Sequence, residues 1–168
     1  MRFYWGEECE AWLTERKRTK PEAVQGTARY RLAYPHEPHR VFYNAHWIAT
    51  QLTYRMQVLL WITKGGIWPS TENWHLYYRL RQSYHDYRLL HEAPGHLFLE
   101  YEAEGLASFL QLSMLNGWDG YVLTQADYAN VFFSHDEYLD FYGGAIDEVR
   151  KALGEEMAAV KYPADPRV

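Results

Sequence analysis

The segment HEAPGH, from His91 to His96, comes closest in this sequence to a catalytic histidine spacing. In the zinc-binding pattern H-E-x-x-H, the two histidines are four residues apart and share one face of a helix. Here they are five residues apart, which rotates the second by about 140° from the first on an ideal helix. Pro94 and Gly95 between them also disfavour a helix. We predict a turn and no cofactor; the alternative is a divalent metal held by His91 and His96.

A second candidate site is the segment SHDEYLDFY, from Ser134 to Tyr142, in which one histidine precedes three carboxylates. A histidine beside carboxylates can carry out general acid–base chemistry, so a hydrolase that uses these residues, with or without a metal, is one alternative function. The spacing from Ser134 to Glu137 also matches the capping box of a helix N-terminus, where acidic residues are favoured without any substrate. We therefore predict a helix that begins at His135.

The acidic and aromatic residues of this region also suit a different role. Carboxylates interleaved with aromatic rings form a good surface for gripping a basic patch on another protein. The residues that we predict to form this partner-binding surface are Trp118, Asp119, Asp136, Glu137, Tyr138, Asp140 and Tyr142.

A third cluster, from Tyr77 to Arg88, alternates arginines with tyrosines. Such interleaving can bind single-stranded nucleic acid by ring stacking and phosphate contacts, here through Arg79, Arg81 and Arg88. The same pattern is typical of an amphipathic helix with half-buried tyrosines and outward-reaching arginines. With a net charge of −5, the chain lacks the general positive charge that attracts nucleic acid. Nucleic-acid binding is therefore the last of the three functions that we consider.

The composition is that of a globular protein with an unusual number of aromatic residues. Of the 168 residues, 48% are hydrophobic and 23% charged, while 15 Tyr and 7 Trp help to raise the aromatic fraction to 17%. Tyr and Trp combine an apolar ring with one polar atom and are common at protein–protein contacts. The single cysteine, Cys9, excludes an internal disulfide, and no apolar run approaches the length of about 18 residues that a membrane span needs. We expect a soluble, cytoplasmic protein.

Hydrophobic periodicity and turn signals predict the secondary structure. Asn44 is a candidate helix N-cap, apolar residues recur at helical spacing after it, and Lys64, Gly65 and Gly66 form a stop signal. The expected helices cover residues 7–18, 44–63, about 71–85, about 105–115 and a stretch from 135. The expected strands cover residues 29–34, 41–43, 121–124 and 129–133, and the last two form a hairpin.

These elements predict an α+β fold that is mostly helical, with four to five helices packed around a small antiparallel sheet. The alternative is a nearly all-α chain with one hairpin. Residues 1–161 are expected to form a single globular domain, and residues 162–168, which include two prolines, a frayed tail.

For function, the sequence favours a non-catalytic protein-interaction module, such as a bacterial inhibitor or immunity-type protein with a basic protein partner. Small size, acidity and a surplus of Tyr and Trp support this hypothesis. The glycine pairs at 65–66 and 143–144 lack the other residues of a phosphate-binding loop, and no serine lies in a nucleophile elbow motif. The sequence therefore offers no complete catalytic template.

Overall fold

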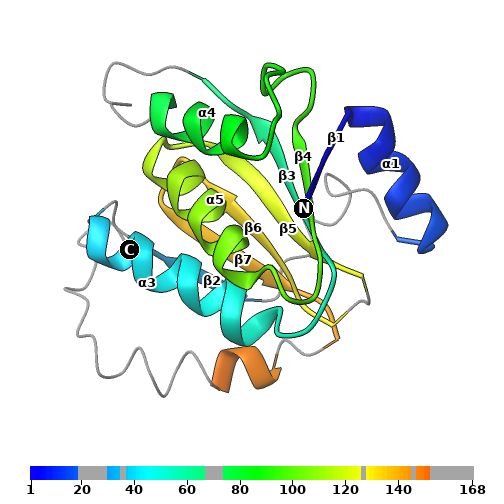
Figure 1. Cartoon of the computed structure of the whole chain (residues 1–168). Coiled ribbons are helices and arrows are strands. Elements are labelled where there is room, and N and C mark those ends of the chain that lie inside the picture. The colour runs from blue at the N-terminus through cyan, green and yellow to red at the C-terminus, as the bar shows by residue number, and fades with distance from the viewer. Residues whose placement is uncertain (19–29, 35–36, 67–73, 126–127, 145–146, 152–168) are drawn as a thin grey trace.

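The protein is built on one antiparallel sheet of seven strands, in the order β1-β4-β3-β5-β6-β7-β2 (Figure 1). The computed structural model describes residues 1–18, 30–34, 37–66, 74–125, 128–144 and 147–151. The strands are β1 (Arg2–Tyr4), β2 (Tyr30–Ala33), β3 (Val58–Lys64), β4 (Gly95–Phe98), β5 (Asp119–Thr124), β6 (Asn130–Ser134) and β7 (Tyr138–Tyr142). The labelled helices are α1 (Gly6–Glu15), α3 (Pro38–Trp47), α4 (Trp74–Ser83) and α5 (Ala103–Leu115), and a π-helical turn, η1 (Ile48–Leu52), directly follows α3. Residues 147–151 are also helical.

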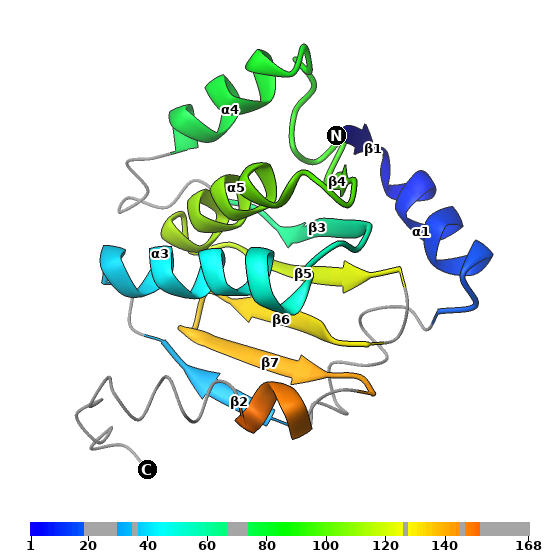
Figure 2. The same cartoon turned by 60° about the horizontal axis from the view of Figure 1, so that its bottom comes forward.

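The first two strands of the chain lie at opposite edges of the sheet. In β1, Phe3 pairs with His96 of β4. In β2, Arg31 pairs with Asp140 of β7. Because the five other strands lie between these edges, two segments that are close in sequence are separated by the width of the sheet (Figure 2).

Different helices cover the two faces of the sheet. Helices α3, α4 and α5 lie on one side, whereas α1 lies apart from them, near the β1 edge (Figures 1 and 2). Side chains of β3 alternate between these environments. Leu60 belongs to the core that includes α3 and α5, while Leu59 belongs to a second core that includes Trp12 of α1. Strand β3 is therefore buried on both faces.

The expectation of a mostly helical molecule with a small sheet is wrong, as is the alternative of a nearly all-α chain. The combination of helices and antiparallel strands is α+β in kind, but the seven-stranded sheet is its centre. The largest error concerns residues 44–63, where the helical part ends at Leu52 and β3 begins at Val58. Because β3 is buried on both faces, its apolar run does not alternate, and periodicity alone cannot distinguish it from a buried helix.

The strand expected at residues 41–43 is also wrong, because these residues lie within α3. Pro38 occupies the first turn of that helix, where its missing N–H would have had no helical partner. Pro38 therefore marks the start of a helix.

The helix expected from His135 is replaced by the turn between β6 and β7. The backbone N–H of Glu137 donates to the carbonyl oxygen of Ser134 over 3.1 Å, and Glu137 has a φ of 63°. The Ser134 hydroxyl accepts a hydrogen bond from the backbone N–H of Asp136 over 3.2 Å. Serine does accept a backbone bond, as in a capping box, but here that bond stabilises a hairpin.

Other expectations are confirmed. The expected helices near residues 7–18, 71–85 and 105–115 correspond to α1, α4 and α5, and the strands near 29–34, 121–124 and 129–133 correspond to β2, β5 and β6. Strands β5 and β6 pair as the expected hairpin. The expected start of α4 at residues 70–71 and the tail at 162–168 lie outside the described residues. Among the described helices, none has both the length and the apolar character to cross a bilayer.

Candidate functional site

A groove of about 930 Å³ lies beside the edge strand β1. Its walls come from β1, the first turn of α1 and the loop that follows α4, and we call it the β1 groove. The residues that line it include Phe3, Tyr4, Glu8, Asp86, Arg88 and Glu92. Two further lining residues, Tyr84 and Tyr87, expose 44% and 73% of their surface. Aromatic side chains this exposed are typical of contact surfaces.

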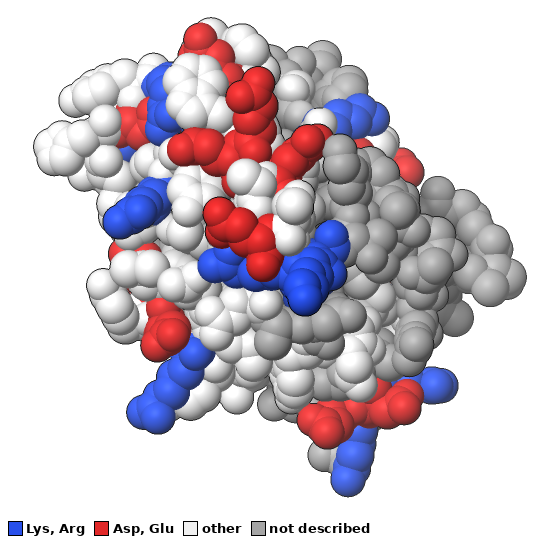
Figure 3. Space-filling view, turned by 90° about the vertical axis from the view of Figure 1, so that its right-hand side faces the viewer, with Lys and Arg blue, Asp and Glu red and all other residues white. Residues whose placement is uncertain are grey.

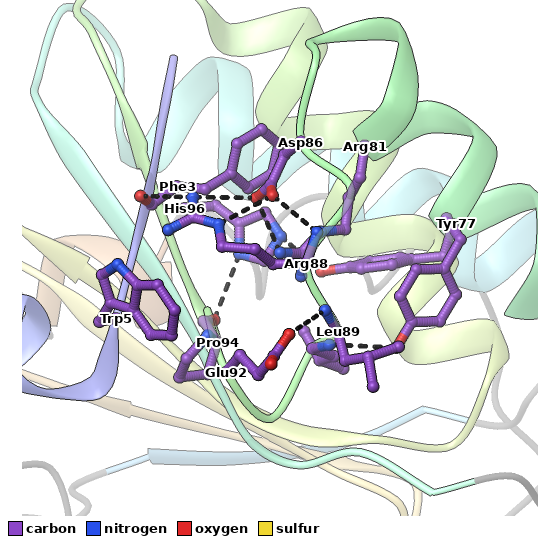
Figure 4. Close-up of polar contacts among 12 residues, drawn as sticks. Phe3, Trp5, Tyr77, Arg81, Asp86, Arg88, Leu89, Glu92, Pro94 and His96 are labelled. Atoms are coloured by element: carbon purple, nitrogen blue, oxygen red, sulfur yellow. Dashed lines mark hydrogen bonds and ion pairs between the residues drawn. The ribbon is translucent and has the colours of Figure 1, made fainter.

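Asp86 holds the loop after α4 in place through two arginines (Figure 4). Arg81 Nη2 donates to Asp86 Oδ2 over 2.8 Å, and Arg88 Nε donates to Asp86 Oδ1 over 2.9 Å. Both Arg81 and Asp86 are buried. Burial by itself raises the pKa of Asp86, but the hydrogen bonds from Arg88 and Arg81 outweigh it and lower the pKa below its usual value.

Arg88 also covers the free edge of the sheet. Its Nη2 donates to the carbonyl oxygen of Phe3 over 3.2 Å, and its guanidinium carbon lies 5.0 Å from the ring centre of Trp5. A backbone carbonyl on an edge strand is an open acceptor for another strand. Because Arg88 occupies the Phe3 carbonyl, this edge is partly protected from pairing with another chain.

Beneath the groove, a buried histidine joins β4 to α4. His96 Nε2 lies 2.9 Å from the Tyr77 hydroxyl, and Nδ1 lies 3.2 Å from the carbonyl oxygen of Pro94. That carbonyl can only accept, so Nδ1 carries the proton and Nε2 accepts from Tyr77. Burial, aided by the charge of Arg81, lowers the pKa of His96 to about 3, and burial raises the pKa of Tyr77. Neither group has the pKa near neutrality that acid–base catalysis requires.

The outer face of α1 is acidic. Cys9, Trp12 and Leu13 are its buried residues, so the remaining faces of the helix point outward. The exposed acidic residues of this helix are Glu7, Glu8, Glu10 and Glu15. Figure 3 shows carboxylates gathered on this side of the molecule, with a smaller group of basic side chains beside them. This acidic face adjoins the β1 groove, because Glu8 belongs to both.

The structure spreads the predicted partner-binding residues over different environments. Trp118 is buried against Tyr77, with ring centres 4.7 Å apart, and its Nε1 donates to the carbonyl oxygen of Gly66 over 2.8 Å. Asp140 and Tyr142 are buried as well. The remaining residues of that predicted surface lie at or beside the β6–β7 turn and include the exposed Asp136 and Glu137 and the half-buried Asp119 and Tyr138.

At the β6–β7 turn, His135 is held by Asp119. Asp119 Oδ1 accepts from the backbone N–H of His135 and lies 2.7 Å from its Nδ1. The other ring nitrogen, Nε2, lies 3.4 Å from Asp136 Oδ1. Both imidazole nitrogens therefore face carboxylates, an arrangement that fastens the turn to the start of β5.

Asp140 forms the ion pair of the opposite sheet edge. Arg31 Nε and Nη2 each donate to one of its oxygens over 2.6 Å, and the Arg31 guanidinium carbon lies 3.9 Å from the ring centre of Tyr138. The Asp140 side chain is fully buried, whereas 61% of the Arg31 side chain is exposed. This bidentate pair locks the register of β2 against β7.

The two alternative sites receive less support from the geometry. Arg79 is exposed. Arg81 and Arg88 each form an ion pair with Asp86. Asp86 therefore binds two of the three arginines that were predicted to contact nucleic acid. His91 is exposed while His96 is buried. Within the described part of the chain, no three His, Cys, Asp or Glu side chains gather closely enough to hold a metal ion.

Sequence reasoning did not single out the β1 groove, although a signal for its acidic wall was present. Cys9, Trp12 and Leu13 have the i, i+3, i+4 spacing of a buried helix stripe, which places the glutamates of the same helix outside. Asp86 had no comparable signal, because its two arginines and the β1 edge meet only in three dimensions. No protein-family model, curated protein or solved structure matches the chain.

Proposed function

We propose that the protein is a non-catalytic interaction module that binds a basic segment of a partner protein across α1 and the β1 groove. The proposal rests on one observation: two exposed aromatic residues lie close to the exposed glutamates of α1. Trp5 directly precedes α1, and Tyr87 lines the same groove as Glu8. Carboxylates attract and orient a basic partner, and aromatic rings supply the contact area that dominates binding energy.

The protein contains an internal example of the recognition that we propose. Arg88 combines a carboxylate contact with Asp86 and a ring contact with Trp5. An arginine of the partner that stacks on Tyr87 and pairs with Glu8 or Glu92 would repeat this chemistry at the rim of the same groove.

We also propose a reducing, cytoplasmic setting for this interaction. Cys9 is fully buried, and burial, reinforced by the charge of Glu8, raises the pKa of its thiol to about 12. A thiol with so high a pKa stays protonated and unreactive at neutral pH, which suits a chain without disulfides.

The test is a selection of binding peptides from a random display library, followed by affinity measurements on a synthetic copy of the best peptide. We expect the selected peptides to be rich in Arg and Lys, and their affinity to fall with salt because exposed charges are screened. The double variant Glu7→Gln/Tyr87→Ala is expected to lower the affinity about tenfold or more.

The matched control alters the acids of the β6–β7 turn in the double variant Asp136→Asn/Glu137→Gln, which should leave the affinity unchanged. If this control loses binding and the α1 variant does not, the binding surface lies at the turn. If the selected peptides carry no excess of basic residues, the proposed function is wrong.

A further inference from the structure

The backbone groups of Phe3 in the edge strand β1 point away from the sheet. Between β3 and β4, Ile62 N–H donates to the carbonyl oxygen of Pro94 over 3.1 Å, and Leu60 lies opposite His96. Hydrogen-bonded pairs recur at every second residue of an antiparallel ladder, so the backbone groups of His96 face Leu60. Phe3 is paired with His96 from the other side. Its N–H and carbonyl group therefore face outward.

One of these two outward groups is covered and the other is open. The Phe3 carbonyl oxygen accepts a hydrogen bond from Arg88 Nη2 over 3.2 Å (Figure 4). No described residue accepts a hydrogen bond from the Phe3 N–H. The next outward N–H along the chain, that of Trp5, donates to Glu8 Oε2 over 2.7 Å. The part of the edge that can pair with another strand is therefore centred on Phe3.

Arg88 is a cover that another strand can displace. Its guanidinium also donates to Asp86, through Nε over 2.9 Å and through Nη2 over 3.2 Å, and 31% of the Arg88 side chain is exposed. When the contact with Phe3 is broken, Asp86 and solvent still satisfy the donors of Arg88. A backbone N–H of a partner can therefore bond to the Phe3 carbonyl oxygen in its place at little cost.

A strand added at Phe3 would present its side chains to two different surfaces. Residues 2–4 line the β1 groove together with Glu8 from α1 and Tyr87 from the loop after α4. Phe3 packs against the core that includes α3 and α5, and Tyr4 packs against the core that includes Trp12 of α1. Because successive side chains of a strand point to opposite faces, a residue opposite Phe3 shares the face of Phe3. Its two neighbours share the face of α1.

Charge distinguishes the two neighbouring positions on the α1 face. The Glu8 carboxylate lies at the Tyr4 end of β1, because it accepts from the N–H of Trp5. Arg2 stands at the other end of the strand and is exposed. Opposite charges on facing strands stabilise the pairing and like charges weaken it. A basic residue is therefore favoured opposite Tyr4 and disfavoured opposite Arg2.

We propose that the basic segment of the partner binds as an extended strand that pairs with Phe3 of β1, displaces Arg88 from the Phe3 carbonyl oxygen and places a basic residue opposite Tyr4. The inference rests on the proposed function for its occupant and adds the conformation and register of that occupant. Strand addition to a sheet edge draws affinity from main-chain hydrogen bonds and specificity from alternate side chains. Since α1 and the loop after α4 flank β1, a separate extended segment fits beside it, whereas the equally flanked β1 of a second copy does not.

The first test is an N-methyl scan of the best Arg- and Lys-rich peptide from the library selection, in which one backbone N–H at a time is replaced by N–CH₃. This change keeps every side-chain charge. We expect methylation of the residue whose N–H bonds to the Phe3 carbonyl to lower the affinity about tenfold or more. Methylation of the residue on either side should change it less than about twofold, because those N–H groups point away from β1.

The second test follows hydrogen exchange of single amides in the whole protein by NMR. Saturation with the peptide is expected to slow exchange of the Phe3 amide about tenfold or more, because this N–H then has an acceptor. The Arg31 amide of β2, at the opposite edge of the sheet, should keep its exchange rate.

A matched pair of variants on α1 tests the register. Glu8→Gln is expected to weaken binding of the peptide about threefold to tenfold. The same variant should have no effect on a peptide in which norleucine replaces the basic residue next to the methylation-sensitive position. Glu15→Gln alters an acid at the other end of α1, away from Tyr4, and should leave both affinities unchanged.

The outcomes separate this inference from the proposed function. If basic peptides bind but no position is sensitive to methylation, or if consecutive positions are equally sensitive, the partner does not pair as a strand, while the proposed function stands. Protection of the Phe3 amide in a dimer of the peptide-free protein would make a second copy the occupant and overturn the inference. If the selected peptides are not basic, both proposals fail.

Discussion

The two edges of the sheet are each fastened by an arginine–aspartate contact beside an aromatic ring, but the two contacts are built in opposite ways. At the β1 edge, Arg81 and Asp86 are both buried, and Arg88 adds a second cation to the same carboxylate. At the β2 edge, Asp140 is buried, but its single arginine, Arg31, is mostly exposed. At the β1 edge, a buried arginine therefore depends on the charge of Asp86. At the β2 edge, the buried Asp140 depends on the charge of an exposed arginine.

This difference determines whether removing the acid or removing the base destabilises each edge more. Removing one member of a buried ion pair leaves the other charged group without compensation, and that loss is larger than the net contribution of the intact pair. A side chain that reaches solvent can be rehydrated instead. The two edges should therefore respond in opposite order to removal of the acid and removal of the base.

The largest effect is expected for Asp86→Asn, which retains the side-chain size but leaves the buried Arg81 guanidinium without its counter-charge. We expect the free energy of unfolding at neutral pH to fall by about 3–5 kcal/mol. The matched variant Asp140→Asn leaves Arg31, which solvent can reach, and should lose only about 1–2 kcal/mol. Urea unfolding measures both, and equal losses would show that burial of Arg81 does not decide the outcome.

The second prediction concerns His96, which has no counterpart in the ion pair of the β2 edge. Its pKa falls from 6.5 to about 3 on folding, so between these values the unfolded chain binds a proton that the folded protein does not. Stability must therefore decrease as the pH falls below 6.5. At pH 4.5 the loss from this group is about 2–3 kcal/mol.

The variant His96→Gln should flatten this pH dependence whatever its stability at neutral pH, and unfolding at a series of pH values measures the slope. Asp86 does not confuse the measurement, because its lowered pKa confines its contribution to the region below its ordinary value of 3.8. An unchanged slope in His96→Gln would contradict the assignment.

The order of the two edges should reverse when the arginines are replaced. Arg31→Met removes both hydrogen bonds from the buried Asp140 and should reduce the free energy of unfolding by about 2 kcal/mol. Arg88→Met leaves Asp86 with Arg81 and should reduce it by about 1 kcal/mol or less. Unfolding in urea at neutral pH tests the order. A greater loss in Arg88→Met would remove the proposed contrast between the edges.

Sequence patterns predicted the elements whose structure depends on neighbouring residues. The short strand-like runs at residues 121–124 and 129–133 predict the β5–β6 hairpin that the structure contains. Helix α5 was likewise found from acidic residues before it and Asn116-Gly117 after it. In both cases the turn or cap that limits the element is adjacent to it in the sequence.

Sequence patterns did not predict the elements that depend on residues far away in the chain. Strands β1 and β4 have three and four residues, too few to show a period, and each is defined by the strand beside it. The Ser134–Glu137 spacing fits both a helix start and a hairpin turn, and pairing with β6 and β2 decides in favour of the turn. The Asp86 contacts and the β1 groove belong to the same class, because they form only when the loop after α4 reaches β1.

The position of β1 and β2 at opposite edges has a consequence for synthesis of the chain. Phe3 pairs with His96, and Tyr30 pairs with Phe141. The partner of each edge strand has therefore not yet been synthesised when that strand leaves the ribosome. Contacts between residues so far apart in sequence slow folding. The strands made first are therefore among the last to be paired, and the sheet can be completed only after β7 has been made.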